Sequence, residues 1–460
     1  MALIKSISGI RGTIGGNVGE NLTPQDIVEC TAAFGAWTLK KTKNPKIVVG
    51  RDARISGSLV NQLVVSTLRM LGITVVDLGL STTPTVEIAV PLEQAGAGII
   101  LTASHNPKQW NALKFLNEKG EFISGKDGQD VLNLIGTGKI KYATVERLGG
   151  YEQRTDYIDK HIDQILALPL VNVEAIQAKN YKIVVDAVNS TGAIAVPPLL
   201  ERLGCEVVVI NETPNGHFAH NPEPLPAHLN QLSKKLQDER AHLGIAVDPD
   251  VDRLAFVRED GVAFGEEYTL VAVADYVLQH TPGNTVSNLS STRALRDVTE
   301  KHGQKYEASA VGEVNVVTKM KEVNAPIGGE GNGGIIYPEL HYGRDALVGI
   351  ALFLSHLAAS NMPASRLRQT YPKYHIVKNK IQLTPEINVD DVLTKLHEKY
   401  KKHQLTTIDG LKIDLQDGWI HLRKSNTEPI IRIYAEGTSE VIARNLAGKI
   451  MADMTEIIRR

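Results

Sequence analysis

Two stretches of this chain repeat one pattern, and the repeat constrains the fold more than any other feature. Residues 46–76 and 182–208 both begin with KIVV, continue through a helical stretch to a Leu-Gly pair, and end in a second apolar strand. Strand, helix, glycine and strand in this order predict a βαβ unit. A weaker third copy covers residues 284–303. The repeat favours duplicated α/β domains over one large sheet.

The C-terminal part of the chain has a different pattern. A strand, an amphipathic helix, two short strands around a polar turn and a terminal helix are expected at residues 373–383, 389–403, 419–423, 430–435 and from about 439. This order predicts a smaller α+β unit. A chain of 460 residues is too long for one ordinary core. We expect four domains, at residues 1–150, 151–258, 259–371 and 372–460.

Charge and composition narrow the functional classes. Lys and Arg number 50 and Asp and Glu 52, which leaves no overall attraction to nucleic acid or anionic lipid. Cys30 and Cys205, the only cysteines, exclude a disulfide framework, a CxxC redox pair and a cysteine-rich zinc site. The N-terminus lacks a signal-peptide pattern, and the longest apolar run, residues 346–354, is too short to span a bilayer. We expect a cytoplasmic enzyme without nucleic-acid or membrane partners.

A serine stands at the end of a predicted strand. Residues 102–107 read TASHNP and follow an apolar strand at 96–101. The Asn-Pro turn presents Ser104 where ligands of open α/β sheets usually bind. A serine nucleophile needs a base or a leaving group already in place, and His105 lies beside it, with Lys114 ten residues on. A structural serine in an Asn-Pro turn is the alternative.

Three aspartates alternate after another predicted strand. Asp248, Asp250 and Asp252 lie in the sequence DPDVDR, and carboxylates so close together repel one another unless a cation neutralises them. Oxygen ligands without histidine or cysteine favour Mg²⁺. With Glu259 the spacing matches an EF-hand, but Arg253 occupies the position that needs glycine and the flanking segments are strands, which excludes a calcium loop. A solvated acidic turn is the alternative.

Two further loops suit a phosphorylated ligand. RKSNTEP at residues 423–429, followed by Arg432, offers hydroxyls, loop N–H groups and arginines for a phosphate dianion, although a polar hairpin turn has the same composition. GEGNGG at residues 329–334 matches GxGxxG, but Pro338 prevents a following helix and so excludes dinucleotide binding. A glycine-rich loop with a glutamate can still approach a polar ligand closely.

Together these segments resemble the α-D-phosphohexomutase superfamily, which includes phosphoglucomutase/phosphomannomutases and phosphoglucosamine mutases. The resemblance spans essentially the whole chain and rests on the order of segments at residues 9–12, 102–107, 248–253, 265–268, 328–333 and 423–429. It implies an α/β fold of three similar domains with mixed sheets and a smaller C-terminal α+β domain, with the active site in the central cleft.

The resemblance also implies a role for each segment. Ser104 would be the phosphoserine, and the Mg²⁺ ligands would be Ser104, Asp248, Asp250 and Asp252. Near the reacting phosphate would lie Arg11, His105, Arg253 and the general acid/base, Lys114. The sugar would contact Glu266, Glu267, Glu330 and Asn332. The phosphate that is not transferred would be held by Arg423, Ser425, Asn426, Thr427 and Arg432. Many relatives have glycine where this chain has Pro249 and Val251, but the three aspartates remain, so we expect metal binding to remain.

The implied reaction moves a phosphoryl group between O6 and O1 of a hexose phosphate through a 1,6-bisphosphate, and a hexose 1,6-bisphosphate primes the serine. The sugar loop GGEGNGG resembles that of archaeal-type phosphoglucosamine mutases, whereas SNT in the phosphate loop is similar to some phosphomannomutase/phosphoglucomutases. We favour glucosamine 6-phosphate, with mannose or glucose phosphate as the alternative.

Two other functional classes remain as alternatives. A Mg²⁺-dependent phosphatase would not need the sugar loops or the distal phosphate loop. A silent sugar-phosphate-binding paralogue would be expected to lose Ser104, an aspartate or Lys114, and this chain keeps them all. The expected partners are small-molecule sugar phosphates, and a homodimer is compatible with the resemblance.

Overall fold

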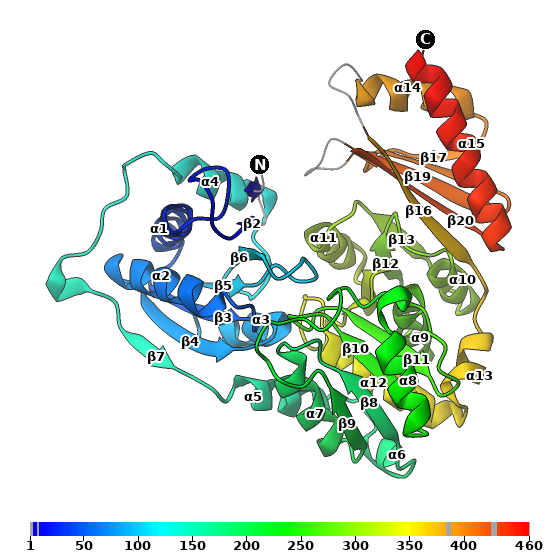
Figure 1. Ribbon diagram of the computed structural model, residues 1–460, viewed down its shortest axis with the longest axis horizontal. Coiled ribbons are helices and arrows are strands. Elements are labelled where there is room, and N and C mark those ends of the chain that lie inside the picture. Colours follow the sequence, from blue (N-terminus) through cyan, green and yellow to red (C-terminus); the bar gives the residue numbers. More distant parts are fainter. Residues whose placement is uncertain (1–2, 7–8, 383–387, 425–429, 460) are drawn as a thin grey trace.

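The chain forms four successive sheets with helices packed against them (Figure 1). The structure is a computed structural model that describes residues 3–6, 9–382, 388–424 and 430–459. Its sheets have seven, four, four and five strands. In the part of the chain so described, no helix has both the length and the apolar character needed to cross a membrane.

The first sheet is mixed and has helices on both faces. In spatial order its strands are β1 (Ile4–Ser6), β2 (Gly9–Thr13), β6 (Trp110–Leu116), β5 (Ala97–Leu101), β3 (Lys46–Arg51), β4 (Thr74–Leu80) and β7 (Tyr151–Gln153). Its helices are α1 (Pro24–Lys41), α2 (Gly57–Met70), α3 (Thr83–Leu92), α4 (Gly125–Leu134) and the short η1 (Val145–Arg147). Ile47 and Val49 belong to one core cluster, with side chains of α1 and α2, while Val48 belongs to another, with side chains of α3. This is the alternation that a strand buried on both faces requires.

The second and third sheets each have four strands. Their spatial orders are β11 (Leu254–Arg258), β10 (Leu243–Val247), β8 (Lys182–Asp186), β9 (Glu206–Ile210), and β13 (Tyr306–Ser309), β12 (Thr285–Asn288), β14 (Ile327–Glu330), β15 (Gly334–Ile336). The helices of the second unit are α5 (Tyr157–Leu166), α6 (Val173–Gln177), α7 (Gly192–Arg202), η2 (Pro226–His228) and α8 (Asn230–Asp238). Those of the third are α9 (Glu266–His280), α10 (Ala294–Lys301), α11 (Glu313–Val323), α12 (Ala346–Ser360) and α13 (Ala364–Gln369). One hydrophobic cluster joins the two units, and Phe256 of β11 stacks on Phe353 of α12 at 3.9 Å between ring centroids.

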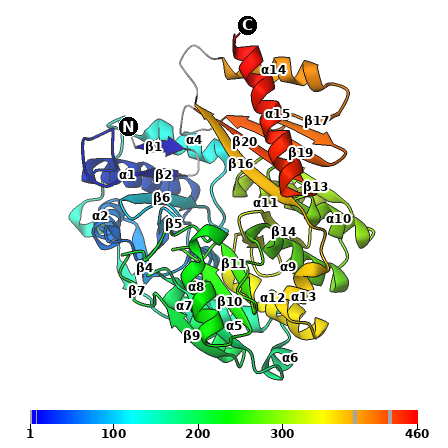
Figure 2. The same ribbon diagram turned by 45° about the vertical axis from the view of Figure 1, so that its right-hand side comes forward.

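The fourth sheet is antiparallel and has its own core. Its strands, in spatial order, are β16 (His375–Gln382), β20 (Ile430–Gly437), β19 (Gly418–Lys424), β18 (Leu411–Leu415) and β17 (Gln404–Thr406). The helices α14 (Val389–Tyr400) and α15 (Glu440–Arg459) lie against it (Figures 1 and 2). The expected strand-helix-strand-strand-helix order is present, and β17 and β18 are additional strands that the sequence analysis did not identify.

The first three sheets share one topology, so the repeat in the sequence is a structural repeat. The strand orders β4-β3-β5-β6, β9-β8-β10-β11 and β13-β12-β14-β15 correspond, with three parallel strands and an antiparallel edge strand or neighbour in each. The glycines that end the equivalent helices, Gly72, Gly204 and Gly303, all have positive φ (82°, 77° and 72°), as a left-handed helix end requires. The equivalent strands β5, β10 and β14 lead into the Ser104 loop, the aspartate loop and the Glu330 loop. The repeat therefore brings three different loops to the same edge position of three sheets.

Candidate active site

Ser104 is held in a strained loop immediately after β5. Its φ of +49° is in the left-handed region, where residues other than glycine are uncommon, and its side chain is buried. The backbone N–H of Ser104 donates to Thr102 Oγ1 (2.9 Å), and Ser104 Oγ donates to Asp248 Oδ2 (2.6 Å). The structure thus joins the Ser104 loop of the first unit to the aspartate loop of the second.

Arg54 organises this loop, although the sequence analysis did not identify it. The side chain is 1% exposed, and its guanidinium donates to the backbone carbonyls of Pro107 (2.8 Å), Trp110 (3.0 Å), Asn106 (2.7 Å) and Ser104. Its Nε donates to Asp52 Oδ2 (3.0 Å), which also accepts from Thr102 Oγ1 (2.6 Å). The available sequence signal was a charged segment directly after the buried strand β3, at the sheet edge that also carries Ser104.

The three aspartates converge in the loop between β10 and β11. Asp248, Asp250 and Asp252 are fully buried, and one ligand oxygen from each lies within 4.8 Å of the others. Asp248 Oδ1 accepts from the backbone N–H groups of Asp252 and Arg253, both at 3.1 Å, which closes the loop on itself. Val251 at its tip has a φ of +61°, an unusual conformation for a β-branched residue.

The electrostatics of this loop fit a hard cation. Burial and the charges of Asp250 and Asp252 raise the pKa of Asp248 well above its ordinary value. Among the described residues, Asp250 Oδ1 and Asp252 Oδ1 are buried without a hydrogen-bond partner. Crowded carboxylates with free, buried oxygens are the ligands that Mg²⁺ prefers. The residues present therefore fit a magnesium ion beside Ser104.

Lys114 lies inside β6 and faces the same aspartates. Its Nζ is 2.9 Å from Asp250 Oδ2 and 3.8 Å from Asp252 Oδ2. Although burial alone would lower it, Asp250 and Asp252 raise the pKa of Lys114. Thr83 Oγ1 at the start of α3 donates to the same Asp250 oxygen at 2.6 Å, a contact that the sequence analysis did not foresee. Lys114 is therefore a protonated amine paired with the aspartate loop.

Cationic groups from four units lie near His105, the neighbour of the serine, or near one another. Burial and the charges of Arg253, Arg344 and Arg11 lower the pKa of His105 to about 2, so this imidazole, whose Nδ1 is 3.4 Å from Ser104 Oγ, is neutral at physiological pH. Burial and the charges of Arg432 and Arg253 lower the pKa of Arg11. Arg253 is oriented by an ion pair with Glu223 at 3.0 Å. Positive charges held close together favour an anionic ligand between them.

The expected sugar loops lie together on the third unit. Glu330 Oε1 accepts from Asn288 Nδ2 (2.8 Å), and Asn332 Nδ2 lies 3.4 Å from Glu330 Oε2. Position 331 has no room for a side chain. The carboxylate of Glu267 packs against Gly331, and a Cβ there would lie 2.0 Å from Glu267 Oε2. Burial raises the pKa of Glu267 to about 8. Its neighbour Glu266 is 3.7 Å from Lys378 Nζ of the C-terminal sheet.

Arg344 connects the sugar loop to the aspartate loop, and sequence analysis missed it as well. Its guanidinium donates to Asp252 Oδ2 (2.6 Å), Glu330 Oε2 (3.0 Å) and Glu313 Oε2 (2.9 Å), and all four side chains are buried. Although burial alone would raise it, Arg344 and Asn288 lower the pKa of Glu330. One arginine therefore binds three carboxylates that come from a loop, a strand and a helix.

The proposed phosphate loop is only partly described. Ser425, Asn426 and Thr427 lie outside the described residues. Arg423 and Arg432 are directly opposite each other on β19 and β20, and Lys380 of β16 is opposite Arg432 in turn. Like charges in opposite positions destabilise a sheet, and here Arg423 is paired with Asp409 at 2.8 Å. Arg432 also lies close enough to Arg11 to lower its pKa, which brings this sheet toward the Ser104 loop.

Comparisons with known proteins point to one family along nearly the whole chain. Four family models match, described as phosphoglucomutase/phosphomannomutase alpha/beta/alpha domain I (residues 3–140), domain II (159–261), domain III (265–374) and C-terminal domain (380–452). The chain is 34% identical over 440 residues to the phosphoglucomutase/phosphomannomutase of Thermococcus kodakarensis, covering 94% of this chain and 95% of that one. It is 32% identical over 458 residues to a protein of Methanopyrus kandleri named "Probable phosphoglucosamine mutase", covering 98% and 97%. A solved structure of a phosphoglucomutase/phosphomannomutase family protein from Burkholderia thailandensis superposes with a TM-score of 0.85 at 27% identity, covering 98% and 97%.

Proposed function

The chain belongs to the phosphoglucomutase/phosphomannomutase family, and we propose that it is a phosphohexomutase that acts through a phosphorylated Ser104. The observation that carries the proposal is the hydrogen bond from Ser104 Oγ to the buried aspartate loop, at 2.6 Å, within a ring of cationic side chains. Phosphoryl transfer depends on positioning and charge neutralisation, and this arrangement supplies both. The Ser104 loop, the aspartate loop, the sugar loops and the phosphate loop would divide the work among residues 1–150, 151–258, 259–371 and 372–460.

The chemistry has two transfers of opposite direction. In the first, a sugar hydroxyl attacks the phosphoserine phosphorus, the Ser104 Oγ–P bond breaks, and a hexose 1,6-bisphosphate forms. The intermediate then turns end for end, and Ser104 Oγ attacks the other phosphate, so that the second sugar oxygen leaves and the phosphoserine is restored. A hexose 1,6-bisphosphate added from solution would prime an unphosphorylated chain by the same second step.

Asp248, Asp250 and Asp252, with an oxygen on Ser104, would hold Mg²⁺, which neutralises charge on the phosphoryl oxygens when it is bound. Lys114 is protonated here, so it is suited to give a proton to the sugar oxygen that leaves phosphorus. For Lys114 to accept a proton in the opposite step, its ion pair with Asp250 has to open. His105 stays neutral and contributes an orienting hydrogen bond, while Arg11 and Arg253 add positive charge.

The two ends of the sugar phosphate would be held by different parts of the chain. Glu266, Glu267, Glu330 and Asn332 would bind sugar hydroxyls, and Arg423, Ser425, Asn426, Thr427 and Arg432 would bind the phosphate that is not transferred. A phosphatase has no use for the second of these sites, because water needs no distal anchor. Arg423 and Arg432, opposite each other on β19 and β20, which flank the phosphate loop, are placed as the mutase proposal requires.

We propose glucosamine 6-phosphate as the preferred substrate, converted to glucosamine 1-phosphate. The support is the GGEGNGG loop and the similarity to a protein named as a phosphoglucosamine mutase. The relative named phosphoglucomutase/phosphomannomutase is equally similar, so mannose and glucose phosphates are the second candidates. The amine-for-hydroxyl exchange at sugar C2 is worth only about 1–3 kcal/mol in the transition state.

The test is a comparison of kcat/KM for glucosamine 6-phosphate, mannose 1-phosphate and glucose 1-phosphate, with Mg²⁺ and a priming bisphosphate. A preference of about tenfold for the amino sugar, equal to about 1.4 kcal/mol, supports the proposal. The same margin for another sugar would refute the substrate and leave the mutase. Steady release of inorganic phosphate would refute the mutase, and Ser104→Ala is the control that should prevent phosphoenzyme formation.

Sugar-phosphate substrates also suggest where the enzyme is located and which partners it has. We propose a cytoplasmic enzyme whose partners are small sugar phosphates, with no nucleic-acid or membrane partner, which the net charge of −2 supports. A homodimer remains the hypothesis for its assembly, and light scattering of the purified protein tests it.

A further inference from the structure

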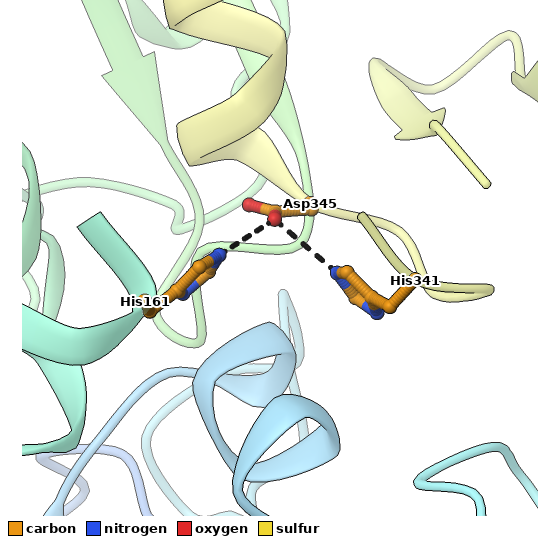
Figure 3. Close-up of side chains that lie close together, drawn as sticks. All are labelled: His161, His341 and Asp345. Carbon is orange, nitrogen blue, oxygen red and sulfur yellow. Dashed lines mark hydrogen bonds and ion pairs between the residues drawn. The ribbon is translucent and has the colours of Figure 1, made fainter. Parts of the chain in front are cut away.

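A second polar cluster lies buried where the first three units meet, and the proposed mutase reaction does not use it. It consists of His161 of α5, His341 in the loop after β15, and Asp345, which immediately precedes α12 (Figure 3). His161 and Asp345 are fully buried, and the side chain of His341 is 12% exposed. Both Nε2 atoms point at one oxygen, Asp345 Oδ2, at 2.8 Å from His161 and 3.2 Å from His341.

The opposite nitrogen of each imidazole faces α3 of the first unit. His161 Nδ1 is 3.0 Å from Thr85 Oγ1, and His341 Nδ1 is 3.3 Å from Glu87 Oε2. Histidines that bind metals are usually oriented in this way, with Nδ1 toward a hydroxyl, carbonyl or carboxylate and Nε2 toward the ion. The other oxygen of Asp345 accepts from the N–H groups of Leu347 and Val348, so its carboxylate is fixed in place as the cap of α12.

With both imidazoles neutral, the protons of this cluster do not satisfy every buried group. If Nδ1 of each ring donates, two Nε2 lone pairs and a carboxylate oxygen face one another, which is repulsive unless a cation lies among them. If each Nε2 donates to Asp345 instead, His341 Nδ1 needs a donor, and the nearest group is Glu87. Glu87 is 2% exposed, and neither of its oxygens nor His341 Nδ1 has a hydrogen bond to any described residue. Unless both imidazoles are protonated, the buried carboxylates of Glu87 and Asp345 therefore carry more negative charge than the cluster compensates, and a bound cation would offset it.

We propose that His161, His341 and Asp345 bind one divalent transition-metal ion, with zinc as the first candidate. The three ligand atoms lie within 4.8 Å of one another. Two imidazole nitrogens and one carboxylate oxygen suit zinc or cobalt, whereas the all-oxygen site of the three aspartates suits magnesium. Three protein ligands leave a position for water. The two sites would thus select different ions within one chain.

The ion would act as a structural link between units. His161 comes from the second unit, His341 and Asp345 come from the third, and the Nδ1 contacts reach Thr85 and Glu87 of the first. Binding energy at a site built from separate units stabilises the arrangement that forms it. This inference does not depend on the proposed substrate or on turnover.

Cobalt binding to the metal-free protein tests the inference directly. The background variant is Asp248→Asn/Asp250→Asn, which removes charge from the other site. We expect one equivalent of Co²⁺ with the intense visible absorption of a four- or five-coordinate nitrogen-containing site, displaced by Zn²⁺. His161→Gln and His341→Gln in the same background should weaken binding by about tenfold or more. His356→Gln is the matched control, since His356 is buried and hydrogen-bonded to Tyr371 outside the cluster.

Two measurements test metal binding without the histidine variants, in case one of those variants folds poorly. Zn²⁺ should raise the melting temperature of the background variant, and ¹¹³Cd NMR of the otherwise unmodified chain should report nitrogen ligands. Absence of both signals, or a cobalt spectrum unchanged by His161→Gln and His341→Gln, would overturn the inference. The cluster would then hold protons only.

Discussion

Arg54 allows the most complete prediction, because the structure accounts for every hydrogen of its guanidinium. Five N–H donors meet five acceptors: the Asp52 carboxylate and the carbonyls of Ser104, Asn106, Pro107 and Trp110. A lysine ammonium has only three donors, so Arg54→Lys leaves at least two of these buried acceptors unpaired. Each unpaired acceptor costs about 1–3 kcal/mol, so we expect a loss of about 2–6 kcal/mol in the free energy of unfolding.

The same substitution should slow the reaction. The lost bonds hold the carbonyl of Ser104 and those of three residues that follow it, and a shift of about 1 Å in a reacting group can reduce the rate by about 100-fold. We expect kcat to fall by that order while KM changes little, because Arg54 touches none of the sugar loops. Steady-state kinetics and urea unfolding of the purified variant measure the two effects.

Arg368→Lys is the control for this experiment. Arg368 is also an arginine with a restricted environment, and its Nε donates to the Phe264 carbonyl at 3.1 Å, away from Ser104. It should lose stability and keep its kcat, while any change in KM would reflect its contact with Tyr268 beside Glu266 and Glu267. If Arg54→Lys is destabilised but retains full kcat, Arg54 does not position the serine and the reasoning is wrong.

Three further predictions concern other buried groups. Arg344→Met should lower kcat/KM and destabilise the chain by about 3–5 kcal/mol. A double-mutant cycle with Glu330→Gln should be non-additive, because the two side chains are in contact. Additive effects would show that the contact between Arg344 and Glu330 does not couple the two residues. Val251 has positive φ, so Val251→Gly should be at least as stable in thermal melts as Val251→Ala, the reverse of the usual order. Burial lowers the pKa of Lys412 from 10.5 to about 8, so the unfolded chain binds more protons between these values and stability should rise with pH across that range. Lys412→Met should remove that rise in melts recorded over the same pH range, and a persistent rise would assign it to another group.

The parts of the fold that could be predicted are those with local signals. The βαβ repeats were visible because strand, helix and closing glycine are consecutive, and the left-handed Gly72 and Gly204 occupy the predicted helix ends. The aspartate loop was visible because its three carboxylates are separated by single residues and follow a short buried strand. Its fit to a cation needed only the chemistry of those side chains.

The missed residues act on partners that are distant in the sequence. Arg54 binds carbonyls about fifty residues away, and Arg344 binds Asp252 ninety-two residues away. Neither separation leaves a pattern in a single sequence. Lys114 was noted but not placed, since only the pairing of β6 with β2 and β5 shows that it faces the aspartates from within a strand.

The shared topology of the first three sheets has an evolutionary consequence. Strands β5, β10 and β14 occupy one equivalent position, yet the segments they lead into carry the proposed nucleophile, the proposed metal ligands and a proposed sugar contact. Duplication of an ancestral module accounts for this, because a spare copy can diverge while the others preserve the original role. Duplication also places substrate preference and phosphoryl transfer on different copies, so that selection can alter one without the other. If the proposed roles hold, changes confined to the third copy would redirect the enzyme to a new sugar while the proposed phosphoryl carrier and cation site are inherited unchanged.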